Sequence, residues 1–126
     1  MDKRNNKDAE LKSYEAFFDS VSLELYHYAV FSLKDEKGAE DAVRYAYVAG
    51  YKSFLSGNSK DMESILFKII SQLLVKNNDD VIKRCAVYLL FKLKFKLEKA
   101  ASILSLSPFC MKEILNNVIS SVRTAV

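Results

Sequence analysis

The stretch that decides the fold is residues 97–126, LEKAASILSLSPFCMKEILNNVISSVRTAV. Its pattern predicts two helices joined by a short turn. Ser107 can cap a helix through its hydroxyl, and Pro108 suits the first helical position because its missing N–H would have no intrahelical partner there. Upstream, small Ala101 lies on an apolar face, where two crossing helices come closest. The pattern is typical of a helix-turn-helix, which offers its second helix to a DNA groove, and equally of two packed helices with no nucleic-acid role.

The composition of the chain favours an all-α fold. Half of its 126 residues are hydrophobic, and three Gly and one Pro provide few signals for turns. No apolar run approaches the length of a membrane span, and residues 1–12 are polar where a secretory signal would need an apolar core. We therefore expect a cytoplasmic protein without membrane contact, and a disordered polar tail over residues 1–12.

Helical spacing of apolar residues predicts four helices upstream of the helix-turn-helix. They cover residues 14–33, 39 to about 55, about 62–74 and 81 to about 93. Asn58 with Asp61 matches a capping arrangement for the third helix, and Asp80 can cap the fourth. The third helix has the widest apolar stripe, which must be buried in a monomer core or in a dimer. It comprises Met62, Ile65, Leu66, Ile69, Ile70, Leu73 and Leu74.

The polar run KNNDD, residues 76–80, separates the third and fourth helices. We take it as the boundary between two small helical modules, residues 13–76 and residues 81–126. Further along, FKLKFKL, residues 91–97, alternates as a strand would. Because an isolated strand has nothing to pair with, we expect the middle of this run to be a turn between helices.

Charge is distributed unevenly between the two predicted modules. Residues 1–76 contain eleven Lys and Arg against twelve Asp and Glu, whereas residues 77–126 contain eight against four. A small basic helical module favours contact with phosphates, although this excess is modest for a DNA-binding domain.

The sequence offers little for an enzyme or a metal site. His27 is the only histidine and has no evident nucleophile beside it, and no glycine-rich phosphate loop is present. Cys85 and Cys110 match neither a zinc ligand set nor a disulfide framework, so we expect two buried thiols. We therefore expect no catalytic residue, metal, cofactor or small-molecule substrate.

Four segments resemble, in order, the helices of one protein family. AEDAVRYAYVAGY, residues 39–51, is similar to the helix with which bacterial sigma factors of the extracytoplasmic-function type bind core RNA polymerase, where the run is close to AEDLVQEAFLRAW. Residues 14–35 are similar to the first helix of that family, and MESILFKIISQLL, residues 62–74, to its promoter-melting helix. Residues 97–115 resemble its helix-turn-helix for the upstream promoter element.

The resemblance implies a three-helix bundle like sigma region 2, followed by a helix-turn-helix module like sigma region 4. It implies transcription initiation, with core RNA polymerase and promoter DNA as partners and an anti-sigma factor as a further partner. The polymerase-binding residues that it implies are Glu40, Asp41, Arg44, Tyr47 and Tyr51. The DNA-binding residues that it implies are Phe67, Lys68, Ser107, Lys112, Asn116, Asn117 and Arg123.

Departures from the family pattern support a second hypothesis. Ile65 stands where the family usually has Trp, and Ile114 and Ile119 stand where its last helix is mostly basic, so DNA binding without polymerase should be weak. The break at residues 75–80 reaches at most roughly 20 Å, whereas the two promoter elements of the family lie on the order of 58 Å apart along the duplex. The alternative is therefore a sigma-derived regulatory protein that binds polymerase or another regulator and has lost most DNA-reading residues.

Overall fold

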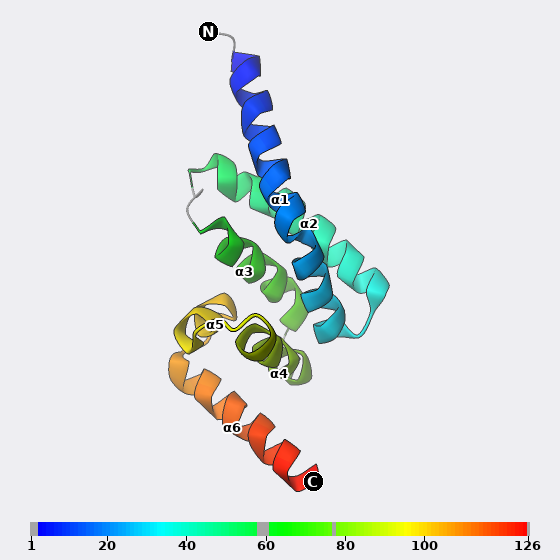
Figure 1. Ribbon diagram of the computed structural model, residues 1–126, viewed down its shortest axis with the longest axis vertical. Coiled ribbons are helices and arrows are strands. Elements are labelled where there is room, and N and C mark those ends of the chain that lie inside the picture. Colours follow the sequence, from blue (N-terminus) through cyan, green and yellow to red (C-terminus); the bar gives the residue numbers. More distant parts are fainter. Residues whose placement is uncertain (1–2, 58–60, 77, 126) are drawn as a thin grey trace.

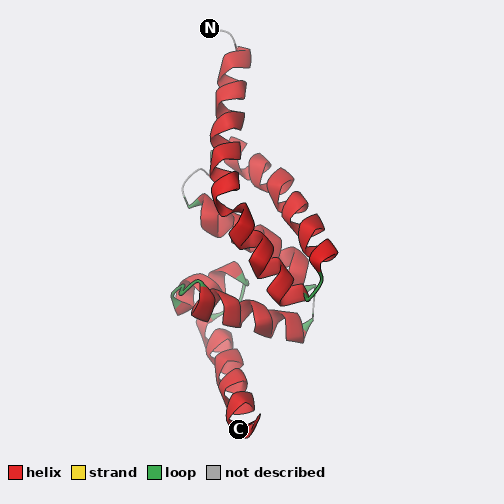
Figure 2. Ribbon diagram, turned by 45° about the vertical axis from the view of Figure 1, so that its right-hand side comes forward, coloured by secondary structure: helices red, strands yellow, loops and turns green. Residues whose placement is uncertain are grey.

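The structure is a computed structural model that describes the backbone of residues 3–57, 61–76 and 78–125, and the side chains of residues 9–57, 61–76 and 78–120. Within this part of the chain it contains six α-helices, one π-helical turn and no strand (Figures 1 and 2), which confirms the predicted all-α class. The elements are α1 (Lys3–Leu33), α2 (Glu36–Leu55), α3 (Met62–Val75), α4 (Asp79–Val87), η1 (Tyr88–Lys92), α5 (Leu97–Ile103) and α6 (Pro108–Ala125).

Helix α3 lies at the centre of the arrangement. It packs against α1 and α2 on one side and against α4 and α5 on the other, while α6 packs on α4 and α5. The first turns of α1 and the last part of α6 extend from opposite ends of the molecule (Figure 1). None of the described helices combines the length and the hydropathy that crossing a membrane requires.

The small residues of α2 allow it to pack closely on α1 and α3. Ala39, Ala42, Ala46 and Gly50 are buried along one face of α2, as their helical spacing predicts. A Cβ at Gly50 would lie only 2.4 Å from Leu66 Cδ2 and 2.6 Å from the Tyr14 hydroxyl. Glycine is therefore required here by the close approach of three helices.

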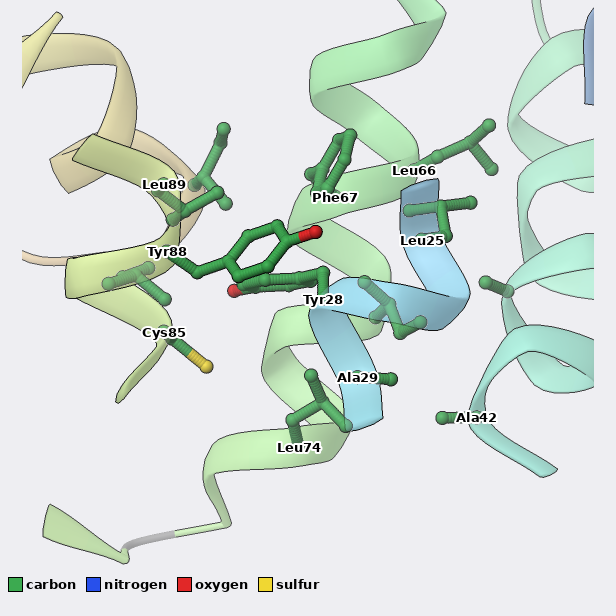
Figure 3. Close-up of a cluster of buried hydrophobic side chains, with 14 of the residues drawn as sticks. Leu25, Tyr28, Ala29, Ala42, Leu66, Phe67, Leu74, Cys85, Tyr88 and Leu89 are labelled. Carbon is green, nitrogen blue, oxygen red and sulfur yellow. The ribbon is translucent and has the colours of Figure 1, made fainter. Parts of the chain in front are cut away.

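The buried face of α3 is shifted from the apolar stripe that its sequence predicts, because Ile65, Ile69 and Leu73 of that stripe are only partly buried. Leu66, Ile70 and Leu74 belong to the predicted stripe and are buried, but Phe67 and Ser71 are buried as well. Phe67 has no exposed surface, and its ring lies 5.4 Å from that of Tyr28 on α1 (Figure 3). The hydroxyls of Tyr28 and Ser71 are 2.5 Å apart, which satisfies two polar groups that burial would otherwise leave unpaired.

The core continues from α1–α3 into α4 and η1 without interruption. Arg84 Nε donates a 2.7 Å hydrogen bond to the carbonyl oxygen of Ser32, and the Cys85 thiol donates to the Ser32 hydroxyl at 3.3 Å. The ring of Tyr88 lies 5.5 Å from that of Tyr28 (Figure 3). The polar break at residues 76–80 thus separates two helices that share one core, and the division of the chain into two modules stays a prediction.

Helix ends differ from the predicted ones in several places. The backbone of residues 3–12 is helical instead of disordered, because extending an already docked helix costs far less than nucleating one. Asn78, not Asp80, caps α4, since its side chain accepts from the backbone N–H groups of Asp80 and Val81. Asp61 makes no capping bond through its side chain, and Asn58 lies outside the described residues.

The alternating run FKLKFKL is a turn between helices, as predicted, but the helix before it ends in a π-helical turn. The N–H of Leu93 donates to the carbonyl oxygen of Tyr88, five residues earlier in the chain. The N–H of Phe95 donates to the carbonyl oxygen of Leu89. Lys94 adopts a left-handed backbone conformation between them, with φ of 57°. This arrangement directs the ring of Phe95 onto Phe67, 5.8 Å away, and so anchors the connection on the core.

Candidate functional site

The turn between α5 and α6 has the hydrogen bonds of a Schellman motif. The N–H of Leu106 bonds to the carbonyl of Ala101, and that of Ser105 bonds to the carbonyl of Ser102. Ser105 takes the left-handed conformation that this motif requires, with φ of 58°. The Ser107 hydroxyl then accepts from the N–H of Cys110 at 3.1 Å, which confirms the predicted cap and the start of α6 at Pro108.

Over residues 108–120, helix α6 buries one narrow face and exposes a wide one. Met111 is fully buried, and Ile114, Leu115 and Val118 are half-buried at helical spacing from it. The exposed face contains Lys112 and Asn116, four residues apart, so these two predicted DNA-binding residues lie side by side. Asn117 is also exposed and takes part in an interaction of its own. The side chain of Arg123 lies outside the described residues.

Phe109 belongs to the same exposed face and was missed by the sequence analysis. It is 68% exposed and lies three residues before Lys112 and seven before Asn116. An exposed aromatic residue at this spacing can contact the methyl group of thymine while Asn addresses an adenine edge. The signal was present in the sequence as an apolar residue outside the buried stripe of α6.

Electrostatics do not make α6 a strongly basic helix. Lys112 and Glu113 are its only charged residues within positions 108–120, and their charges cancel. The basic excess of the C-terminal half lies instead in the connection that leads into α5, where Lys92, Lys94, Lys96 and Lys99 face only one acidic residue, Glu98. Any DNA contact by α6 would therefore depend on groove fit more than on charge.

The two predicted DNA-binding residues on α3 differ in solvent exposure. Lys68 is exposed, whereas Phe67 is fully buried between Tyr28 and Phe95. As the chain is folded here, Phe67 cannot stack on an unpaired base. The sequence leaves open whether this residue belongs to the core or to an interface. It belongs to the core because Tyr28 on α1 and Phe95 before α5 both pack against its ring.

The predicted polymerase-binding residues divide between two environments on α2. Arg44 and Tyr47 line a surface pocket of about 480 Å³ between α1 and α2, whereas Asp41 lines a different one beside the C-terminal end of α3. We call the first the α1–α2 pocket; its lining residues are Phe18, Asp19, Ser22, Val43, Arg44, Tyr47 and Val48. Glu40 is exposed one residue before Asp41.

Tyr47 and Tyr51 have a structural role that their sequence positions did not reveal. Both rings lie within 5.4 Å of the ring of buried Tyr14, and the Tyr14 hydroxyl donates a 2.6 Å hydrogen bond to the Tyr47 carbonyl. The Tyr47 hydroxyl donates in turn to Glu15 on α1 at 3.1 Å. These contacts fix α1 on α2. Arg44 and Val48 also line the α1–α2 pocket, and both side chains are exposed.

The two cysteines differ in exposure, so the expectation of two buried thiols is wrong for one of them. Cys85 is buried, and burial raises the pKa of its thiol above the ordinary value. Cys110 lies in the first turn of α6 and is exposed. Within the residues whose side chains are described, no group of His, Cys, Asp and Glu is placed to hold a metal ion.

Comparison with known proteins adds no further identification. No known protein family matches this chain, and no curated protein matches it.

Proposed function

We propose that this chain is a sigma-like transcription initiation protein that binds core RNA polymerase through α2 and contacts promoter DNA through α6. The observation that carries the proposal is the helix-turn-helix of α5 and α6. Its turn is closed by a Schellman motif, its second helix is capped by Ser107, and one face of that helix is exposed over residues 108–120. Because this helix packs on the protein through a narrow face, its remaining surface is accessible to a DNA groove.

On the DNA side, the proposal assigns base contacts to Phe109 and Asn116 and a phosphate contact to Lys112. With a single cation on this part of α6, DNA affinity without polymerase is low. On the polymerase side, it assigns the contact to Arg44 and Val48 at the α1–α2 pocket and to exposed Glu40 and Asp41 nearer the start of α2. Tyr47 and Tyr51 support that surface from beneath.

A second function is favoured by one specific observation, which is the burial of Phe67. Without an accessible aromatic residue at this position, α3 lacks a stacking group for an unpaired base. The alternative is a regulatory protein that binds polymerase or another regulator, such as an anti-sigma factor, without reading DNA.

Two assays on the purified chain test the proposal and separate it from the alternative. The first is co-elution with bacterial core RNA polymerase, compared between the wild-type chain, the Arg44→Glu/Val48→Asp variant and a Lys83→Glu control on α4. The second is a footprint and run-off transcription on promoters of the source genome, with Lys112→Ala/Asn116→Ala against a Lys12→Ala control.

We expect co-elution that is lost in the α2 variant only, and a footprint that is lost in the α6 variant only. Co-elution without any footprint or transcript would replace the proposal by the regulatory alternative. Absence of both co-elution and footprint would refute the proposal, and with it the form of the alternative in which the chain binds polymerase.

A further inference from the structure

A further pocket lies between α3 and α5, and it joins residues that are far apart in the sequence. It measures about 380 Å³ and lies at the seam where the two helices pack. We call it the α3–α5 pocket; its lining residues are Asp61, Ser64, Ile65, Lys68, Lys99, Ser102 and Ile103.

The polar lining of this pocket consists mainly of donors. Lys68 on α3 and Lys99 on α5 line facing sides of the pocket, together with the hydroxyl residues Ser64 and Ser102. No ion pair within the described residues neutralises either lysine. Two cations with two hydroxyls form a set that matches the oxygens of a phosphate group.

Ser64 gives an independent indication of a ligand. Its hydroxyl oxygen is closed off from solvent and has no hydrogen-bond partner among the described residues. A buried hydroxyl without a partner costs free energy, so its presence in the wall of a pocket needs an explanation. Rotation about χ1 between staggered positions would let this hydroxyl donate to an anion in the pocket.

Lys99 is held in position before any ligand binds. Its Nζ lies 4.2 Å from the centre of the Phe95 ring, and Phe95 is itself fixed edge-on against Phe67 in the core. A cation held over an aromatic ring loses less side-chain entropy on binding an anion than a freely moving lysine does. The pocket also adjoins the first turn of α3, where the helix dipole favours negative charge.

We propose that the α3–α5 pocket binds a phosphate group, with Lys68 and Lys99 as the charged contacts and Ser64 as a hydroxyl donor. Asp61 lies exposed at the edge and opposes the anion, so its charge limits the affinity. The phosphate group comes either from a free phosphorylated molecule or from a nucleic-acid backbone. This inference does not rest on the polymerase and promoter contacts proposed above, and its test uses no polymerase.

The test uses three probes at low salt: inorganic phosphate, pyrophosphate and a short single-stranded oligonucleotide. Binding is followed by backbone amide shifts in ¹H–¹⁵N spectra of the full chain and by calorimetry. The variants are Lys68→Met, Lys99→Met, Ser64→Ala and Asp61→Asn, with Lys83→Met on α4 as the matched charge control. Methionine at position 99 keeps an unbranched apolar side chain over Phe95 while removing the charge.

We expect saturable shifts that centre on Ser64, Lys68 and Lys99. Each Lys→Met change should weaken binding roughly fivefold, Asp61→Asn should tighten it, and Lys83→Met should leave it unchanged. Ser64→Ala should weaken binding and raise the urea midpoint of the free chain, because it removes an unpaired hydroxyl.

The probes distinguish the two sources of the phosphate group. Binding of phosphate or pyrophosphate without the oligonucleotide assigns a free phosphorylated ligand, whereas oligonucleotide binding that both Lys→Met variants weaken assigns a nucleic-acid backbone. Absence of saturable binding by all three probes would overturn the proposal. An equal loss in Lys83→Met would also overturn it, since the effect would then come from overall charge.

Discussion

Replacing Gly50 by alanine should destabilise this chain, although the same change stabilises most helices. The favourable part is helix propensity, about 1 kcal/mol for Gly→Ala in a helix interior. The unfavourable part comes from the new Cβ, which would lie 2.4 Å from Leu66 Cδ2 and 2.6 Å from the Tyr14 hydroxyl. Both neighbours are fully buried and neither can move into solvent.

The magnitude follows from what each neighbour must give up. Overpacking against Leu66 costs about 1–3 kcal/mol. Moving Tyr14 breaks its 2.6 Å hydrogen bond to the Tyr47 carbonyl and leaves a buried hydroxyl unpaired, which costs about 1–3 kcal/mol more. After subtraction of the propensity gain, we expect a net loss of about 3 kcal/mol in the free energy of unfolding. This corresponds to a urea midpoint lower by about 1.5 M and a Tm lower by about 11 °C.

The assay is urea unfolding followed by circular dichroism, with Gly38→Ala as the matched control. A Cβ at Gly38 meets mainly the carboxylate of exposed Asp35, 2.8 Å away, which can turn aside. That variant should therefore be neutral, or more stable by up to about 1 kcal/mol. The double variant Gly50→Ala/Leu66→Val should lose about 0.5 kcal/mol less free energy of unfolding than the sum of the two single variants. The shorter Val side chain makes room for the new methyl group. A Gly50→Ala variant as stable as Gly38→Ala would refute the packing described here.

Three further predictions concern the turn, the buried phenols and the thiols. Ser105→Gly should stabilise the chain by about 0.5–1 kcal/mol in urea unfolding, because glycine adopts φ of 58° without the strain of a side chain; a loss of stability would contradict this. Burial raises the pKa of Tyr14 and Tyr28 above the ordinary tyrosine value, so the folded state holds these protons more tightly than the unfolded state does. Stability should therefore be constant below about pH 9 and fall at higher pH, with phenolate absorbance rising as the urea midpoint drops; a midpoint unchanged to about pH 11 would count against it. A thiol reagent should modify exposed Cys110 in the native chain and buried Cys85 only on unfolding, and equal rates at both would show that the assignment is wrong.

The candidate sites were only partly predictable from the sequence. The resemblance implied Lys112 and Asn116, and their DNA-binding role stays a prediction; their exposure on one face of α6 follows from the helix that begins at Pro108. The burial of Phe67 was not predictable, because its spacing fits either the core or an exposed face until the positions of α1 and of Phe95 are known. Residues 64 and 99, in contrast, have no sequence signal that joins them, since only the packing of α5 on α3 brings them to one pocket.

The sequence by itself determined the helices, their approximate ends and the faces that would be buried. Those features depend on local spacing, on caps such as Ser107 and on the scarcity of Gly and Pro. Tertiary structure decided that α3 would be covered on both sides, that Phe67 and Ser71 would join the core, and that α4 would bond to α1 across the polar break at residues 76–80. The physical reason is that periodicity reports how apolar a face is, whereas the choice of partner depends on shape and on hydrogen bonds between residues distant in the chain.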